Sequence, residues 1–248
     1  MAGVSATAAG PGPSPARHNP RWAVAEQLTD ALRARYDPYL QAIGVHGSLA
    51  HGDDTETSDV DMVVVTRSGR SARDGPRPGA RRVAGVIVDV EVIGAEPYLR
   101  EARTLTTAWP LAADQYISTK ATHDPDGWLP RLRDAHLAHL AQSDARTFSA
   151  LAREAWCRAS SAQSKARRLA EWHETDSAML VLGDARLGVA LVDGLLTRTY
   201  FRSGADAVKR AGVASSHIYE LGDRLAGQAQ ELARRGYPVD GDIDDLVR

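Results

Sequence analysis

A glycine–serine pair and two aspartates stand at a spacing that suits phosphate chemistry. Gly47 and Ser48 follow one short apolar run, and Asp59 and Asp61 stand at the start of the next. Residues two apart in a strand project from the same face, so both carboxylates point to one spot, where a cation would relieve their repulsion. Carboxylates suit Mg²⁺, which completes its shell with water and nucleotide phosphates. Gly47 lets phosphate oxygens approach the backbone closely, and Ser48 adds a hydroxyl.

A second acidic element supports the same chemistry. Residues 85–93 read GVIVDVEVI, in which Asp89 and Glu91 share one face of a predicted strand and three valines cover the other. Acids that alternate along an apolar strand suit a metal cleft better than a core. We therefore predict Asp89 as a third metal-binding carboxylate beside Asp59 and Asp61.

The elements that position these residues follow an α+β pattern. Short apolar runs predict strands near residues 42–46, 60–66 and 86–93. A four-residue apolar spacing predicts a helix over residues 22–36 that packs behind the sheet, and another helix opens near Pro97. The sequence DPDG at 124–127 marks a loop and a domain boundary. Beyond it, helical periodicity predicts a bundle of about four to five helices, at residues 128–139, 147–172, 177–201 and 216–235.

The motif resembles the signature of the nucleotidyltransferase superfamily related to DNA polymerase β: Gly-Ser, ten residues, Asp-x-Asp, then an acidic strand. Within it, the chain is similar to the aminoglycoside nucleotidyltransferases that modify kanamycin. The similarity covers roughly residues 25–242 and is carried by AIGVHGSL at 42–49, by WPL and QY within 109–116, and by RGYPVD at 235–240.

This resemblance implies a fold and an assembly. Residues 1–20 would be a disordered tail and 21–125 a polymerase β-like nucleotidyltransferase domain with a mixed sheet. Residues 126–248 would be a helical domain for substrate binding and dimerisation. In such a homodimer, the helical domain of one subunit completes the site of the other.

The resemblance also implies an activity. The enzyme would transfer AMP from ATP to a hydroxyl of a small acceptor, the 4′-hydroxyl of an aminoglycoside, and so confer antibiotic resistance. Mg²⁺ would be held by Asp59 and Asp61, with Asp89 as the third carboxylate. The nucleotide would contact Gly47, Ser48, His51, Ser58 and Lys165. His51 stands where the family has a phosphate-contacting arginine.

The general base has several candidates. In the family it is a glutamate on a helix of the C-terminal domain, and the corresponding helix here offers Glu154. Alternatively, Asp89 or Glu91 takes the proton, or the acceptor itself differs. Two other functions remain open: modification of a protein or a tRNA end, and nucleotide binding without transfer.

Composition narrows the class of partner. The chain has 248 residues, 43% of them hydrophobic, and a net charge of −2, which argues against a nucleic-acid polymer as substrate. The basic stretch from Arg67 to Arg82 is predicted to be a solvated loop, with phosphate or partner binding as the alternative. A single cysteine, Cys157, allows no intramolecular disulfide and suits a cytoplasmic protein. No apolar run is long enough to span a membrane, and the first 20 residues do not resemble a signal peptide.

Several residues of the helical part are predicted to be structural. His136 and His139 are expected to be a solvated pair, because no third metal ligand accompanies them. Trp156, Trp172 and Tyr200 are expected in the core. The strongly apolar helix at 177–201 is expected to be buried over much of its circumference.

Overall fold

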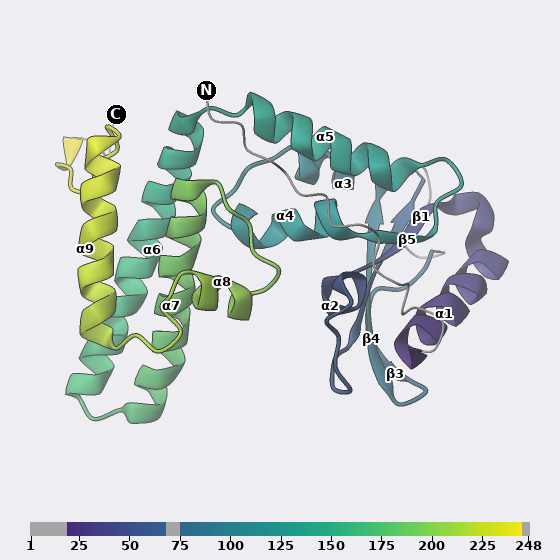
Figure 1. Ribbon diagram of the computed structural model, residues 1–248, viewed down its shortest axis with the longest axis horizontal. Coiled ribbons are helices and arrows are strands. Elements are labelled where there is room, and N and C mark those ends of the chain that lie inside the picture. Colours follow the sequence, from purple (N-terminus) through teal and green to yellow (C-terminus); the bar gives the residue numbers. More distant parts are fainter. Residues whose placement is uncertain (1–18, 68–74, 245–248) are drawn as a thin grey trace, which may run out of the picture.

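The computed structural model describes residues 19–67 and 75–244, and a five-stranded sheet forms the centre of its N-terminal half (Figure 1). The strands lie in the order β3-β4-β2-β1-β5; β2 and β4 are parallel, and the other neighbours are antiparallel. The three predicted strands and the mixed sheet are confirmed, while β3 and β5, which bury few side chains, were not predicted. The bounds are Leu40–His46 (β1), Val60–Thr66 (β2), Gly79–Val83 (β3), Val86–Gly94 (β4) and Lys120–His123 (β5).

Helix α1 (Pro20–Tyr36) covers one face of the sheet. The helix begins where the Asn19 side chain accepts a hydrogen bond from the Arg21 N–H, and proline suits the first turn. Apolar side chains of α1 pack against the buried strand residues of this face, so the predicted packing is confirmed. These side chains are Trp22, Leu28, Leu32 and Tyr36.

The opposite face carries the acids. Val88 is buried on the α1 side of β4, so Asp89 and Glu91 project from the other side. On β2, Val63 and Val65 lie in phase with Asp61 and belong to the core of that second face. Two helices cover this core, α3 (Ala95–Ala102) and α5 (Trp128–Gln142). The acids therefore share one face of the sheet, as their spacing predicts.

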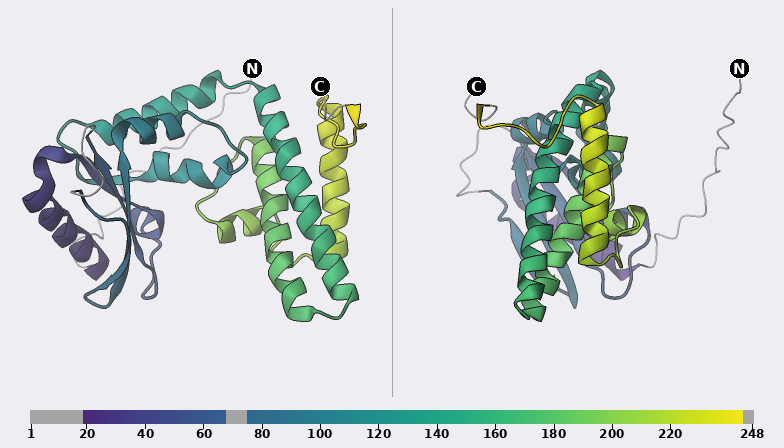
Figure 2. Two further views of the ribbon diagram at one scale, coloured as in Figure 1. Left: turned by 180° about the vertical axis from the view of Figure 1, so that it is seen from behind. Right: turned by 90° about the vertical axis from the view of Figure 1, so that its left-hand side faces the viewer.

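The C-terminal half is helical, which confirms the α+β class. Helices α6, α7 and α9 lie side by side in both views of Figure 2. Their core includes Leu182 and Val189 of α7 together with Leu221 and Leu225 of α9. Two short helices were not predicted, α4 before the bundle and α8 within it. The bounds are Trp109–Ser118 (α4), Ala145–Glu171 (α6), Thr175–Thr197 (α7), Gly204–Arg210 (α8) and Ile218–Arg234 (α9).

Helix α5 contacts both halves. Trp128, Leu129 and Leu132 near its start pack on the sheet. Leu140 near its end packs against the core that contains Phe148 of α6. The domain boundary at residues 125 and 126 therefore stays a proposal, with α5 as the helix that joins the two units.

Two predictions about the helices were wrong. His136 is buried, 1% exposed, because Nδ1–H donates to the Ala102 carbonyl over 2.6 Å and Nε2 accepts from the Trp109 indole, so both nitrogens have partners without water. Trp172 is 63% exposed. The predicted burial of α7 is confirmed for much of the helix, although Leu180 near its start is 74% exposed. Trp172 and Leu180 lie near the tip of the α6–α7 hairpin, beyond the buried core. Trp156 and Tyr200 do pack against the core, as predicted.

Two other predictions fall partly outside the described residues. Of the predicted tail at 1–20, the structure describes Asn19 and Pro20, which start α1. Of the basic stretch, residues 68–74 lie outside, and Arg81 and Arg82 lie in β3, so this part is a strand and not a loop. No described helix is both long and apolar enough to cross a membrane.

Candidate active site

The Gly-Ser pair lies directly against Asp61. Gly47 opens the short helix α2 (Gly47–His51) at the end of β1, with φ of 68°, a conformation that favours glycine. A Cβ at Gly47 would lie 2.3 Å from Oδ2 of Asp61, so the carboxylate occupies the space that any larger residue would fill. Glycine is thus required at position 47 both for the positive φ of the turn and for the space that the Asp61 carboxylate occupies.

The acids of β2 and β4 stand next to one another. Asp61 pairs with Asp89 in the parallel register of the two strands, and Asp59 stands one residue before β2 begins. Burial first, and then the charges of Asp59 and Asp89, raise the pKa of Asp61 from 3.8 to about 6. The shift records the cost of a partly buried carboxylate that lies near two others.

His46 is a member of this site that the sequence reasoning missed. It pairs with Asp61 across β1 and β2. Burial lowers its pKa, although nearby carboxylates, first among them Glu91 and Asp114, act in the opposite direction. The imidazole is therefore held neutral beside the acids.

The donor set suits a magnesium ion. Within the described ranges, no three His, Cys, Asp or Glu side chains already converge as a metal cage, so the set of Asp59, Asp61 and Asp89 remains a prediction. Magnesium usually takes one or two protein carboxylates and fills its shell with water and phosphates. The adjacent pair of Asp61 and Asp89 meets that need, and a cation there would offset the repulsion that raises the pKa of Asp61.

Glu91 is oriented by helix α4. The side-chain amide of Gln115 donates to Oε2 of Glu91 over 3.0 Å and lies 2.9 Å from the hydroxyl of buried Tyr98. Glu91 itself is exposed. A carboxylate that is held at one oxygen and open at the other is suited to accept a proton.

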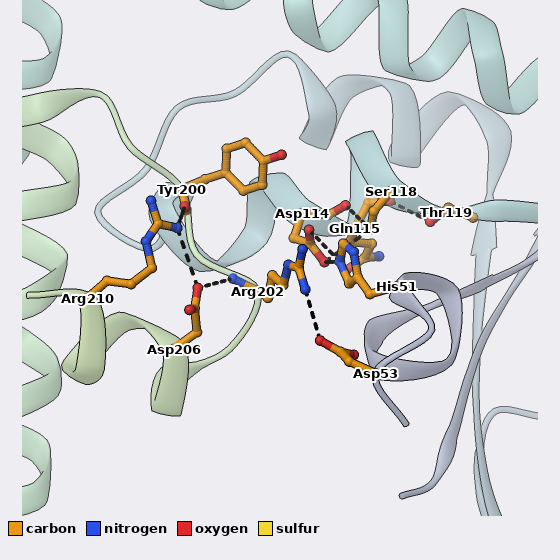
Figure 3. A network of polar contacts seen from close by, with 10 residues as sticks. All are labelled: His51, Asp53, Asp114, Gln115, Ser118, Thr119, Tyr200, Arg202, Asp206 and Arg210. Carbon is orange, nitrogen blue, oxygen red and sulfur yellow. Dashed lines mark hydrogen bonds and ion pairs between the residues drawn. The ribbon is translucent and has the colours of Figure 1, made fainter. Parts of the chain in front are cut away.

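Asp114 of α4 holds His51 of α2. Nε2 of His51 lies 3.0 Å from both oxygens of Asp114, and Ser118 donates to the same carboxylate (Figure 3). Asp114 is 4% exposed. Sequence reasoning missed Asp114, although a lone aspartate inside the apolar run WPLAADQYI was a signal. His51, the predicted phosphate ligand, is therefore held in position by the buried carboxylate of Asp114.

A cavity of about 320 Å³ opens at the Gly-Ser pair, between the two units. This volume is within the range of small-molecule sites. The unit with the sheet contributes α2 and the loop after it, and the helical unit contributes the segment that enters α8. The lining residues are Gly47, Ser48, His51, Asp53, Arg202, Ser203 and Asp206.

Seven of the ten predicted site residues are not among those that line this cavity. Four of the seven are the acids of the sheet, and Asp61 among them lies against Gly47 of the lining. The other three are Glu154, Lys165 and Ser58. Glu154 of α6 is exposed and pairs with Arg158 one turn later. Lys165 lines a different groove, between α6 and α7, with Cys157 and Asp184. Ser58 is used locally, since its hydroxyl accepts a hydrogen bond from the Thr55 N–H. The structure thus brings Gly47, Ser48, His51 and the acids of the sheet together, and it leaves these three apart.

Comparison with known proteins gave a similar solved structure and a family match. Among solved structures, the chain is similar to a nucleotidyltransferase-like protein from Exiguobacterium sibiricum 255-15, with 14% identity over 85% of this chain and 75% of that chain and a TM-score of 0.45. No curated protein sequence matches the chain. Residues 25–105, which hold the Gly-Ser pair and all the acids of the sheet, match the family model described as nucleotidyltransferase domain. A nucleotidyltransferase domain therefore accounts for residues 25–105 of this chain.

Proposed function

We propose that the chain is a Mg²⁺-dependent nucleotidyltransferase that moves AMP from ATP to a hydroxyl of a small acceptor. The observation that carries the proposal is the register of Asp61 beside Asp89, with the Asp61 carboxylate against Gly47. This arrangement unites a carboxylate pair for a cation with a turn that admits phosphate oxygens.

The residues divide the work as follows. Asp59, Asp61 and Asp89 would hold the ion, which when bound would neutralise phosphate charge and lower the pKa of the attacking hydroxyl. Gly47 and Ser48 position the phosphates of the nucleotide. The acceptor oxygen attacks the α-phosphorus in line, a new P–O bond forms, the bond to the β-phosphate breaks, and pyrophosphate leaves.

Glu91 is the general base of this proposal. It projects from the same face as Asp89, and Gln115 fixes one of its oxygens. Asp89, next to Asp61, is better placed as a metal ligand. Glu154 would have to leave Arg158, and it lies on α6 and not on the strand that carries Asp89.

The acceptor class to test first is the aminoglycosides, because the sequence resembles enzymes that modify them. A polycationic acceptor also suits a cleft whose sheet face carries several acids. A homodimer belongs to the same proposal. Support for it comes from the large apolar side chains exposed near the tip of the α6–α7 hairpin, Trp172, Met179 and Leu180.

Transfer of label from α-labelled ATP tests the proposal. The protein is incubated with Mg²⁺ and a panel of kanamycin, tobramycin, neomycin and lincosamides. Asp59→Asn removes a metal ligand, and Asp134→Asn, on the exposed side of α5, is the matched control. We expect label on an aminoglycoside with the wild type and the control, and none with Asp59→Asn. Binding of Mg·ATP without transfer to any acceptor would instead favour a nucleotide-binding relative.

A further inference from the structure

The cavity at Gly47 and Ser48 has a wall that comes from the other unit. Arg202, in the segment between α7 and α8, and Asp206 of α8 reach it (Figure 3). Ser203, which follows Arg202, also lines the cavity. More than 140 residues separate this segment from the Gly-Ser pair in the sequence. The helical unit therefore contributes directly to the place where the phosphates are proposed to lie.

Arg202 is the cation of this wall. Of the described residues that line the cavity, it alone is an arginine or lysine. The neighbouring arginines are engaged within the helical unit. Arg198 lies over the Phe148 ring at 4.8 Å, and Arg210 donates to the Tyr200 carbonyl over 3.1 Å and pairs with Asp206.

Arg202 reaches across the cavity to an acid. Its guanidinium lies 2.9 Å from Oδ2 of Asp53, in the loop that follows α2. The two side chains are 53% and 54% exposed, and ion pairs with such exposure contribute little net stability. A guanidinium binds phosphate more strongly, through two parallel hydrogen bonds. Exchange of Asp53 for a phosphate is thus favourable.

We propose that Arg202 binds the β- and γ-phosphates of the nucleotide, and that Asp53 holds this arginine in the cavity until the nucleotide arrives. The inference rests on the proposed function and adds a ligand from the helical unit. It also adds a guanidinium to a cavity in which His51 is held by Asp114. Binding of the nucleotide tail would then draw on both units at once.

Arg202→Met tests the proposal by titration calorimetry with Mg·ATP and by displacement of ATP with pyrophosphate. We expect both affinities to fall by the same factor, about 10- to 100-fold, because both ligands lose the same charge-assisted contact. Arg202→Lys keeps the positive charge but cannot donate two parallel hydrogen bonds, so its affinities should lie between those of the wild type and Arg202→Met. Asp53→Asn frees the arginine and should tighten ATP binding up to about fivefold.

The controls come from an ion pair of matched exposure. Arg167 and Glu171 of α6 are 56% and 55% exposed and 3.0 Å apart, so Arg167→Met and Glu171→Gln should leave both affinities unchanged. Thermal unfolding shows that each variant is folded. The inference is overturned if Arg202→Met binds ATP like the wild type, or loses ATP but not pyrophosphate, or if Asp53→Asn weakens ATP binding. A wild type that binds no ATP rejects the proposed function itself.

Discussion

Gly47 combines a backbone conformation that favours glycine with direct contact to the proposed metal ligand Asp61. We expect Gly47→Ala to lose about 100-fold in transfer rate, because its Cβ would displace Asp61, whose oxygen lies 2.3 Å from that position. Gly52→Ala is the matched control, since Gly52 also has a positive φ, 77°, but has no atom within 4 Å of the new Cβ. Backbone strain should lower the free energy of unfolding of both variants by about 1–2 kcal/mol, which urea unfolding measures. Equal activity in the two would contradict the contact.

The raised pKa of Asp61 predicts a stability that depends on pH. Without metal, the folded protein binds a proton at Asp61 between about pH 4 and pH 6 while the unfolded chain, with its pKa near 3.8, does not. Stability from this group is therefore present at low pH and lost as pH rises through 6. We expect Asp61→Asn to raise the melting temperature of the metal-free protein more at pH 8 than at pH 5. With Mg²⁺ at pH 8, the wild type should instead melt at a higher temperature than Asp61→Asn. A difference in melting temperature that does not change with pH in the metal-free proteins would contradict the prediction.

Glu91 and Glu154 compete for one role, and their glutamine variants separate them. We expect Glu91→Gln to lower kcat by about 10²–10⁴-fold with little change in ATP affinity, because a proton acceptor is lost. Glu154→Gln should retain activity, since that side chain pairs with Arg158 outside the cavity. The measurement is single-turnover transfer from labelled ATP. A larger loss of activity in Glu154→Gln than in Glu91→Gln would instead identify Glu154 as the general base.

Spacing in the sequence predicted those site residues that lie close to one another along the chain. Asp59, Asp61 and Gly47 fall within 15 residues of one another, and the acids of β4 follow from strand alternation. Asp114 and Arg202 could not be found in this way. Each is brought to the site by a packed helix or a connecting segment, and such contacts depend on the tertiary fold.

Elements with a strong apolar pattern were predicted within a few residues. Strands β1 and β2 are buried along almost their whole length and appear in the sequence as continuous apolar runs. Strand β4 alternates valines with acids around buried Val88, and the long helices show helical periodicity. Strands β3 and β5 expose most of their side chains, so no alternation marks them. Helices α4 and α8 are short, and their periodicity covers too few turns to be recognised.

The α6–α7 hairpin depends on one close contact. A Cβ at Gly188 of α7 would lie 2.8 Å from Cβ of Ala159 on α6, so the two helices meet there through a glycine. We expect Gly188→Ala to destabilise the fold, because overpacking costs about 1–3 kcal/mol and exceeds the gain in helix propensity. Gly183→Ala, on the same helix with no atom within 4 Å, should stabilise it by about 0.5–1 kcal/mol. Urea unfolding of both variants measures the contrast.

Over the whole molecule, helix α4 connects the chemistry of one unit to the packing of the other. Asp114 of α4 holds His51 in the nucleotidyltransferase domain. At the start of the same helix, the Pro110 carbonyl accepts a hydrogen bond from the Phe201 N–H over 2.6 Å, in the segment that carries Arg202. The helical unit is therefore fixed on α4 close to the cavity that it helps to line.

This geometry predicts that one chain builds its own phosphate site. If the homodimer forms, a mixture of Asp59→Asn and Arg202→Met subunits should stay as inactive as its components at low ATP. Arg202 lines the cavity at Gly47 of its own chain, and Gly47 lies against Asp61, the neighbour of Asp59, in that same chain. If the helical unit of the partner completed the site instead, about a quarter of the sites would carry neither substitution after random mixing. Light scattering establishes the oligomeric state, and the activity of the mixture decides between the two arrangements. Since the Arg202–Asp53 pair already spans the two units within one chain, we expect no recovery.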